Sequence, residues 1–447
     1  MSAPRPGPAG SAPGPPSSEA EAYDLVLVSD LHMASGRDPT TGRPARTEDF
    51  ARDGAFARFL GARTAAQAGR GRPWRLVILG DLFDFARVEL GRAGEDRRRL
   101  DTSTSAALAK LDRIAAGHRE VLDAVRALLS AGVPIDVVPG NHDLELARPA
   151  VQRRLRELVE DSESASGARI EFHPWILHVP GVLYAEHGHQ HHDINAAPQL
   201  LQTSELPDET ALEAPLGSQL GEYITHVLEA AYPAAERLDP NVSALIAVLR
   251  ARPGAAIVTW RAHLAFARAL ARHARRARRA APGARAASGE SHRPGAPAGA
   301  TGLAPASVAE LERLVTAALA GTVRRLLGMA VAGGAPRPRT HPAEPPPPGF
   351  MPRAGAAIDR ILRDHGDQVP FYVFGHTHAA ERSRLGTPPA DATYLNTGTW
   401  SELMRGDAIP QTLVAIEVEP SRQPVAALLA WDDELGAERP VEAEEKL

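Results

Sequence analysis

The stretch PIDVVPGNHD, residues 134–143, joins a short apolar run to three polar residues that can carry chemistry. The run from Pro134 to Val138 is short and β-branched, which predicts a buried strand. Side chains that follow such a strand project from the sheet edge where α/β proteins bind ligands. Asn141 offers an amide oxygen to a metal, His142 can act as an acid, and Asp143 is expected to orient that histidine.

The same pattern of a strand followed by polar residues occurs twice towards the N-terminus. Asp30-Leu31-His32 follows the predicted strand Asp24 to Ser29, and alternation in extended backbone would bring the carboxylate and imidazole to one face. Gly80-Asp81-Leu82-Phe83-Asp84 follows the strand Arg75 to Leu79, and the carboxylate of Asp81 can bridge two metals about 3.5–4 Å apart. Each motif alone is also compatible with an ordinary polar loop.

Two histidine motifs follow towards the C-terminus. Glu186-His187-Gly188-His189 comes after the predicted strand Val182 to Ala185, and His187 is favoured as the ligand because it is at the strand end. The neighbouring His189, His191, His192 and Asp193 leave that choice open. Gly375-His376-Thr377-His378 follows the strand Phe371 to Phe374, and its two imidazoles can each complete a different metal.

Composition limits the chemistry that these motifs can support. The chain of 447 residues has 43% hydrophobic and 23% charged residues, which is typical of globular proteins. It has no cysteine, so a metal site must use His, Asn and carboxylate ligands. The net charge of -5 gives no strong indication of nucleic-acid binding. Without a signal peptide or a long apolar run, the protein is expected to be cytoplasmic.

The pattern along the chain predicts an α/β protein with one insertion. Strands alternate early with helical stretches such as Ser103 to Ser130, whereas Thr393–Thr397, Thr412–Glu419 and Val425–Trp431 resemble consecutive antiparallel strands. The expected segments are a disordered tail at 1–21, a first part of the main α/β domain at 22–194, an Ala/Arg-rich helical insertion with disordered loops at 195–355, a second part of that domain at 356–435 and a C-terminal tail at 436–447.

Two other features allow a structural or a functional interpretation. The basic helix expected at 255–280 can contact a membrane surface or a polyanion from the periphery, but it can equally pack its apolar side on the core. The segment Asn396-Thr397-Gly398-Thr399-Trp400 can approach the metals, although a tight turn with Trp400 in the core is favoured.

Taken together and in order, the five motifs resemble those of the calcineurin-like metallophosphoesterase superfamily: D-x-H, G-D-x-x-D, G-N-H-D, a lone His and G-H-x-H. The resemblance implies a four-layer αββα sandwich of two mixed β-sheets flanked by helices. It implies one metal on Asp30, His32, Asp81 and His378, and a second on Asp81, Asn141, His187 and His376.

The resemblance also implies a reaction, the hydrolysis of a phosphomonoester, phosphodiester or pyrophosphate by a metal-bridging hydroxide. His142 would stabilise the transition state or protonate the leaving oxygen, with support from Asp143. Two divalent ions are expected, with Mn²⁺ first and Fe or Zn also compatible with the donors. Asp84 stands where purple acid phosphatases have a Tyr ligand, so an iron-phenolate chromophore is not expected.

Within the superfamily, the DLH, GDLFD, His-Gly and GHTH segments look like those of bacterial UDP-2,3-diacylglucosamine pyrophosphatases. Those enzymes act on a lipid precursor at the membrane face, and they commonly carry Arg at the position of His142. The alternatives are therefore a UDP-sugar-lipid pyrophosphatase, a nuclease, or a non-catalytic scaffold on the same fold.

Overall fold

The computed structural model describes most of the chain outside one long internal segment. The described residues are 23–90 without 39 and 46, 101–160, 168–192, 349–385, 392–401, 411–419, 422–441 and several positions between 195 and 218. The chain divides into two compact units, Met1–Pro215 with Pro347–Leu447, and Leu216–Pro346. All secondary structure given below belongs to the first unit. The predicted N-terminal tail and the basic helix at 255–280 lie outside the described residues.

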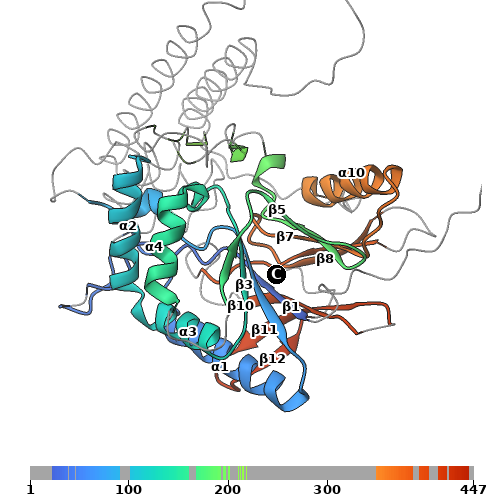
Figure 1. The fold of residues 1–447 in the computed structure, drawn as a ribbon, viewed down its shortest axis with the longest axis horizontal. Helices are drawn as coiled ribbons and strands as arrows, with labels where there is room; N and C mark the ends of the chain where they lie inside the picture. Colours follow the sequence, from blue (N-terminus) through green and yellow to red (C-terminus); the bar gives the residue numbers. More distant parts are fainter. Residues whose placement is uncertain are drawn as a thin grey trace, which may run out of the picture. The chain divides into compact units, whose positions relative to one another are not determined.

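The first sheet has seven strands in the order β12-β11-β10-β1-β2-β3-β4 and is mixed (Figure 1). β1 to β4 run parallel, whereas β10 pairs antiparallel with β1, Val26 opposite Ala415. The strands are β1 Asp24–Val28, β2 Trp74–Leu79, β3 Ile135–Val138, β4 Ile170–Phe172, β10 Gln411–Glu417, β11 Val425–Asp432 and β12 Ala437–Pro440.

The second sheet has five strands in the order β5-β6-β7-β9-β8 and is also mixed. β6, β7 and β9 run parallel, with an antiparallel strand at each edge. Its strands are β5 Ile176–Val179, β6 Leu183–Glu186, β7 Phe371–Phe374, β8 Glu381–Leu385 and β9 Ala392–Asn396. Parallel neighbours β6 and β7 come from opposite sides of the internal segment, so the two halves of the chain share one sheet.

Three hydrophobic clusters separate the layers. One contains Leu27, Val373 and Val414 and lies between the two sheets. A second joins the other face of the seven-stranded sheet to helices α1 Asp53–Arg70, α2 Thr104–Gly117, α3 Arg119–Ser130 and α4 Pro149–Val159. A third joins the five-stranded sheet to α10, Phe350–Asp364. The fold is therefore α/β with two mixed sheets and is compatible with the predicted sandwich.

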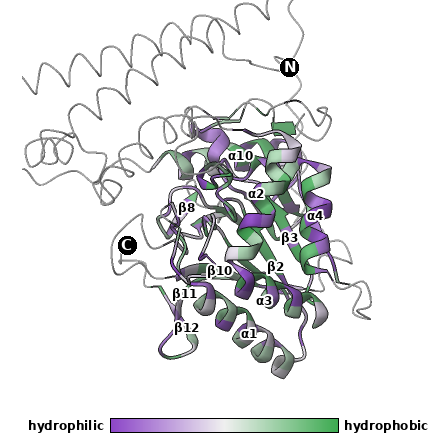
Figure 2. Ribbon diagram, turned by 90° about the vertical axis from the view of Figure 1, so that its left-hand side faces the viewer, coloured by the Kyte–Doolittle hydropathy of each residue, from purple (hydrophilic) through white to green (hydrophobic). Residues whose placement is uncertain are grey.

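Hydropathy follows this layering (Figure 2). All four residues of β3 are buried, as are most of those of β2, and both strands are coloured hydrophobic. The helices carry one apolar side, as in α3, where Val121, Leu122, Val125, Leu128 and Leu129 are buried. Among the described residues, no helix has the length and apolar content needed to cross a bilayer.

The predicted helix Ser103 to Ser130 is two helices that meet at His118. Ser103 caps α2 by accepting a hydrogen bond from the Ala106 amide. Gly117 ends that helix, and any Cβ there would collide with the backbone at Ser35 and Gly36. Close packing of the two backbones therefore interrupts a pattern that reads as continuous in the sequence.

The predicted segment boundaries differ from the observed ones. Residues 195–215 and 347–355, assigned to the insertion, belong to the first unit, because Leu200 and Leu212 pack with Leu144 while α10 packs on the five-stranded sheet. β12, Ala437–Pro440, lies in the segment predicted as a tail and pairs with β11. Most of the predicted helical insertion lies outside the described residues.

Candidate metal centre

The five predicted motifs each begin where a strand ends. Asp30 and His32 follow β1, Asp81 follows β2, and Asn141 follows β3 in the seven-stranded sheet. His187 follows β6, and His376 and His378 follow β7 in the other sheet. The structure thus brings together side chains from both sheets and from both sides of the internal segment.

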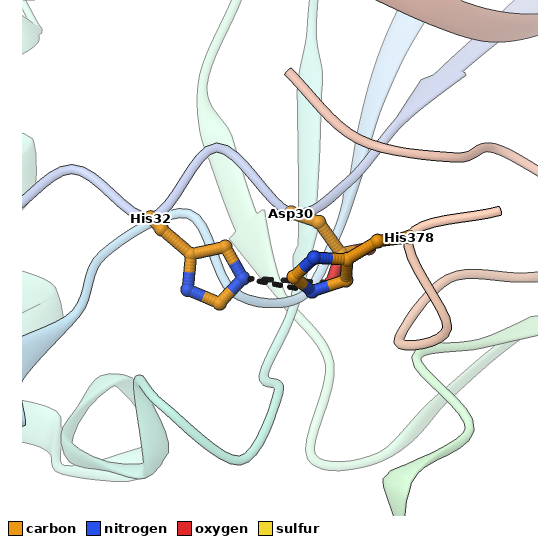
Figure 3. Close-up of side chains that lie close together, drawn as sticks. All are labelled: Asp30, His32 and His378. Carbon is orange, nitrogen blue, oxygen red and sulfur yellow. Dashed lines mark hydrogen bonds and ion pairs between the residues drawn. The ribbon is translucent and has the colours of Figure 1, made fainter. Parts of the chain in front are cut away.

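One group consists of Asp30, His32 and His378 (Figure 3). His378 Nε2 lies 3.1 Å from Asp30 Oδ1 and 3.2 Å from His32 Nε2. Asp30 is fully buried and His32 nearly so. Ligand atoms that share a cation are expected to converge at such distances.

A second group consists of Asp81, His187 and His376. His187 Nε2 lies 3.1 Å from Asp81 Oδ2, and its Nδ1 lies 2.9 Å from the carbonyl oxygen of Leu79. Asp81 Oδ2 also lies 3.7 Å from His32 Nε2, a member of the first group. Asp81 therefore stands between the two groups, as a bridging ligand would.

Several of these ligand atoms have no hydrogen-bond partner although they are buried. Among the described residues they include Asp30 Oδ1, Asn141 Oδ1 and His187 Nε2. A buried polar group left without a partner costs about 1–3 kcal/mol. Cations shared by these oxygen and nitrogen atoms would satisfy them, so the residues present fit a metal centre.

Backbone strain is concentrated at the same positions. The non-glycine residues with positive φ in the described part of the chain have φ between 51 and 69° and are all predicted ligands: Asp30, His32, Asp81, His376 and His378. Left-handed backbone is costly for residues with a Cβ, and it collects at functional sites. The expectation that Asp30 and His32 meet by extended alternation was wrong, because this left-handed conformation directs both side chains to the site.

Glycines make room for the ligands. A Cβ on Gly80 would lie 2.5 Å from His187 Nδ1, and one on Gly140 would overlap Asp81 Oδ1. A Cβ on Gly375 would lie 2.5 Å from Ser29 Oγ and 2.8 Å from Asp30 Oδ2. In each of these motifs a glycine precedes Asp81, Asn141 or His376. Its missing side chain therefore lets the backbone and the side chain of another motif approach each other closely.

Charge is distributed unevenly over the ligands. Burial would raise the pKa of Asp30, but His378 and His187 hold that pKa well below its ordinary value. Burial would lower the pKa of His187, yet the Asp81 and Asp30 carboxylates raise it to about 9. Burial and the nearby His187 lower the pKa of His376 to about 3. The centre thus holds buried anions, which is the charge that a divalent cation requires.

His142 does not have the partner predicted for it. Its Nδ1 lies 2.9 Å from Asp84 Oδ2. The Asp143 carboxylate instead accepts the backbone N–H groups of Gly140 at 2.6 Å and Leu82 at 2.8 Å. Asp143 therefore connects the loop after β3 with the loop after β2 through backbone hydrogen bonds. His142 is oriented instead by Asp84, for which the sequence suggested no such role.

Burial first, and Asp81 second, raise the pKa of the Asp143 carboxyl to about 7. For His142, burial would lower the pKa, but Asp84 and Asp81 raise it above the ordinary value. Its side chain is 30% exposed. His142 is therefore a partly exposed imidazole whose protonated form is favoured by Asp84 and Asp81.

The Asn396–Trp400 segment forms hydrogen bonds with the backbone of two of the motifs. Thr399 Oγ1 donates to the carbonyl oxygen of Asp30 at 2.8 Å, and Asn396 Nδ2 donates to that of Gly375 at 2.7 Å. Trp400 is buried against Phe56 and Phe59, as favoured from the sequence. The segment therefore holds the backbone of two ligand motifs in place.

Among the described residues, His32, Asp84 and His142 form another group that could hold a metal, and a fourth, Asp136, Glu171 and His173, lies outside the five motifs. Arg75 Nη1 approaches the Asp136 carboxylate at 3.0 Å and Glu171 at 3.9 Å. This guanidinium supplies the positive charge that a cation would otherwise bring, so the group fits a structural ion-pair network.

Searches against family models and curated proteins found no match to this chain.

Proposed function

We propose that the chain is a metal-dependent phosphoesterase of the calcineurin-like superfamily, which hydrolyses a phosphomonoester, phosphodiester or pyrophosphate bond. The observation that carries the proposal is the convergence of six of the seven predicted ligands, all but Asn141, on two groups joined by Asp81. A pair of cations so held suits in-line displacement at phosphorus.

Asp30, His32, Asp81 and His378 would hold one ion, and Asp81, Asn141, His187 and His376 the other. When bound, such ions supply Lewis acidity, which activates a water and offsets the charge on the phosphoryl oxygens. The donors are oxygen and nitrogen, which suits Mn²⁺ and is compatible with Fe or Zn.

The chain's own contribution to proton transfer would come from His142. Asp84 holds Nδ1, so the other ring nitrogen is left to face a substrate. Burial would lower the pKa of His142, but Asp84 and Asp81 raise it, which favours the protonated ring. His142 would then donate that proton to the leaving oxygen or stabilise its negative charge.

The test is Mn²⁺-dependent hydrolysis of p-nitrophenyl phosphate, bis-p-nitrophenyl phosphate and a UDP-sugar pyrophosphate by the full chain. His142→Ala should retain its metal and lose about 10²-fold or more in kcat, while Asp81→Ala should lose both metal and activity. Asp123→Asn, at an exposed site on α3, is the control and should match the wild type. An inactive wild-type chain with two metals bound would favour the scaffold alternative.

A further inference from the structure

His376 has two ring nitrogens, and the structure shows the neighbours of one of them. Nε2 lies 3.1 Å from His192 Nδ1 and 3.1 Å from Asn195 Nδ2, and these two atoms are 2.9 Å apart. An imidazole that binds a metal uses one nitrogen as ligand, while the N–H on the other nitrogen donates to an acceptor. His192 Nδ1 can accept such a proton, whereas Asn195 presents its amide nitrogen, a donor, to the same ring atom.

In His187 the neighbours of both ring nitrogens are known, and the two nitrogens have different partners. Its Nδ1 faces the carbonyl oxygen of Leu79 at 2.9 Å, so Nε2, which lies 3.1 Å from Asp81 Oδ2, is the nitrogen that a metal could take. If the two nitrogens of His376 are used in the same way, Nε2 faces His192 and Asn195, and Nδ1 is the nitrogen left for the metal.

The outer partners can accept the Nε2 proton in two ways. His192 Nδ1 can offer its lone pair directly. Alternatively, a half-turn of the Asn195 carboxamide places Oδ1 where Nδ2 stands, and that oxygen can accept from both rings. Only the turned carboxamide removes the Asn195 donor from His376 Nε2, and in that arrangement the proton remains on Nε2.

We propose that His192 and Asn195 are positioning residues which fix the tautomer of His376, so that it presents Nδ1 to the second metal ion. The proposal rests on the proposed function for the presence of that ion. It adds two residues, outside the five motifs, that set the affinity of one of the two positions.

The turn that carries His192 is held rigidly. Gln190 bonds to Ala197 in both directions, its Oε1 accepting from the amide at 2.7 Å and its Nε2 donating to the carbonyl oxygen at 3.1 Å. His191 Nε2 lies 2.7 Å from the buried Glu186 carboxylate. The His192 ring lies against Phe350, with 5.2 Å between ring centroids. These contacts limit the movement of His192 away from His376.

The test is a Mn²⁺ titration of the full chain, followed by electron paramagnetic resonance and by metal analysis after gel filtration. His192→Ala with Asn195→Ala should weaken the second Mn²⁺ about 10- to 100-fold and leave the first unchanged. The signal of a coupled Mn²⁺ pair should then give way to that of a single ion. His192→Asn, which retains an acceptor, should restore the coupled signal when Asn195 is present.

His365→Ala is the matched control, since that exposed histidine bonds to Ile361 at the end of α10 and should not alter the titration. If the double variant fails to fold, Asn195→Ala alone should still weaken the second site measurably. A wild-type titration curve in either folded variant would overturn the proposal. A wild-type chain that binds two ions without hydrolysing any substrate would count against the proposed function alone, because this readout does not use activity.

Discussion

Asp84 connects three side chains around the proposed acid. Its Oδ2 lies 2.9 Å from His142 Nδ1, 3.4 Å from Arg87 Nε and 3.7 Å from His32 Nδ1. Burial would raise the pKa of Asp84, but His142, His32 and Arg87 hold that pKa well below its ordinary value. Asp84 therefore remains an anion and can hold the proton on His142.

For Asp84→Asn we expect kcat to fall about 10- to 100-fold and the alkaline limb of the pH–rate profile to move to lower pH. The sign follows from His142: the Asp84 carboxylate raises its pKa, so removing that charge lowers the pKa and the proton is lost sooner as pH rises. The measurement is kcat against pH with metal content determined in parallel. An unmoved alkaline limb would show that His142 is not the titrating group.

At this scale the sequence predicts which residue types meet but not every pairing. The ligands were predicted because metal-binding motifs keep donors next to each other in the chain. The partner of His142 was assigned to Asp143, its neighbour in sequence, although Asp84, distant in sequence, makes the contact. Neighbouring side chains in a loop point in different directions. Which carboxylate contacts His142 therefore depends on the path of a second loop, the one that carries Asp84.

Among the elements, the turns that follow β2, β3 and β7 each contain a glycine, Gly80, Gly140 or Gly375, that has no room for a Cβ. Gly375→Ala should weaken Mn²⁺ binding by at least 10-fold with little change in secondary structure, because its Cβ would displace the Asp30 carboxylate. Gly61→Ala is the matched control: it has nothing within 4 Å of the added methyl group and should instead stabilise α1 by about 0.5–1 kcal/mol. Metal titration and thermal unfolding of both variants test this contrast.

The junction between α2 and α3 predicts a pH dependence of stability. His118 is buried, with Nδ1 2.7 Å from Asp53 and Nε2 3.2 Å from Glu48. Burial would lower its pKa, but the two carboxylates raise it to about 9 from an ordinary 6.5. Because the folded-state pKa is the higher one, the stabilisation is complete below about pH 6.5 and is lost as pH rises through 9.

We therefore expect the unfolding free energy to fall between pH 6.5 and 9 in the wild type and to change less in His118→Gln. Urea unfolding at several pH values measures it, with His365→Gln, an exposed histidine, as the control. An equal pH dependence in both variants would assign the effect to other groups.

Strands were predicted where apolar runs are buried and missed where they are short, polar or at an edge. β7 matches its predicted range, Phe371 to Phe374, because all four residues are buried. β8 has the sequence ERSRL and an edge position with largely exposed side chains, so no apolar pattern marks it. β4 has three residues, too few for a periodic signal.

At the scale of the whole molecule, the order of strands could not be predicted from local pattern. β6 and β7 are neighbours in one sheet, yet more than a hundred residues separate them in the chain. β10 likewise pairs with β1 across most of the sequence. Such pairings depend on which apolar faces meet in three dimensions, so the predicted sandwich came from the resemblance of the motifs and not from strand periodicity.

Because of this connectivity, the groups that could hold a metal draw on both halves of the chain. Asp30, Asp81 and His187 precede the internal segment, while His376 and His378 follow it. A cation that binds the folded arrangement and not the unfolded chain stabilises it by about 2.7 kcal/mol at a concentration 100 times its Kd. Mn²⁺ should therefore raise the thermal midpoint of the wild-type chain, and a chelator should reverse the increase.

In Asp81→Ala that increase should be largely lost, because the ligand shared by the two groups is gone. Asp123→Asn should keep it, since this exposed carboxylate pairs with Arg126 on the surface of α3. Differential scanning calorimetry with and without Mn²⁺ measures both variants. An undiminished shift in Asp81→Ala would mean that Mn²⁺ binds elsewhere, with Asp136, Glu171 and His173 the next group to examine. If Mn²⁺ raises the thermal midpoint only in chains that retain Asp81, then Mn²⁺ stabilises the two-sheet fold by binding at the proposed centre.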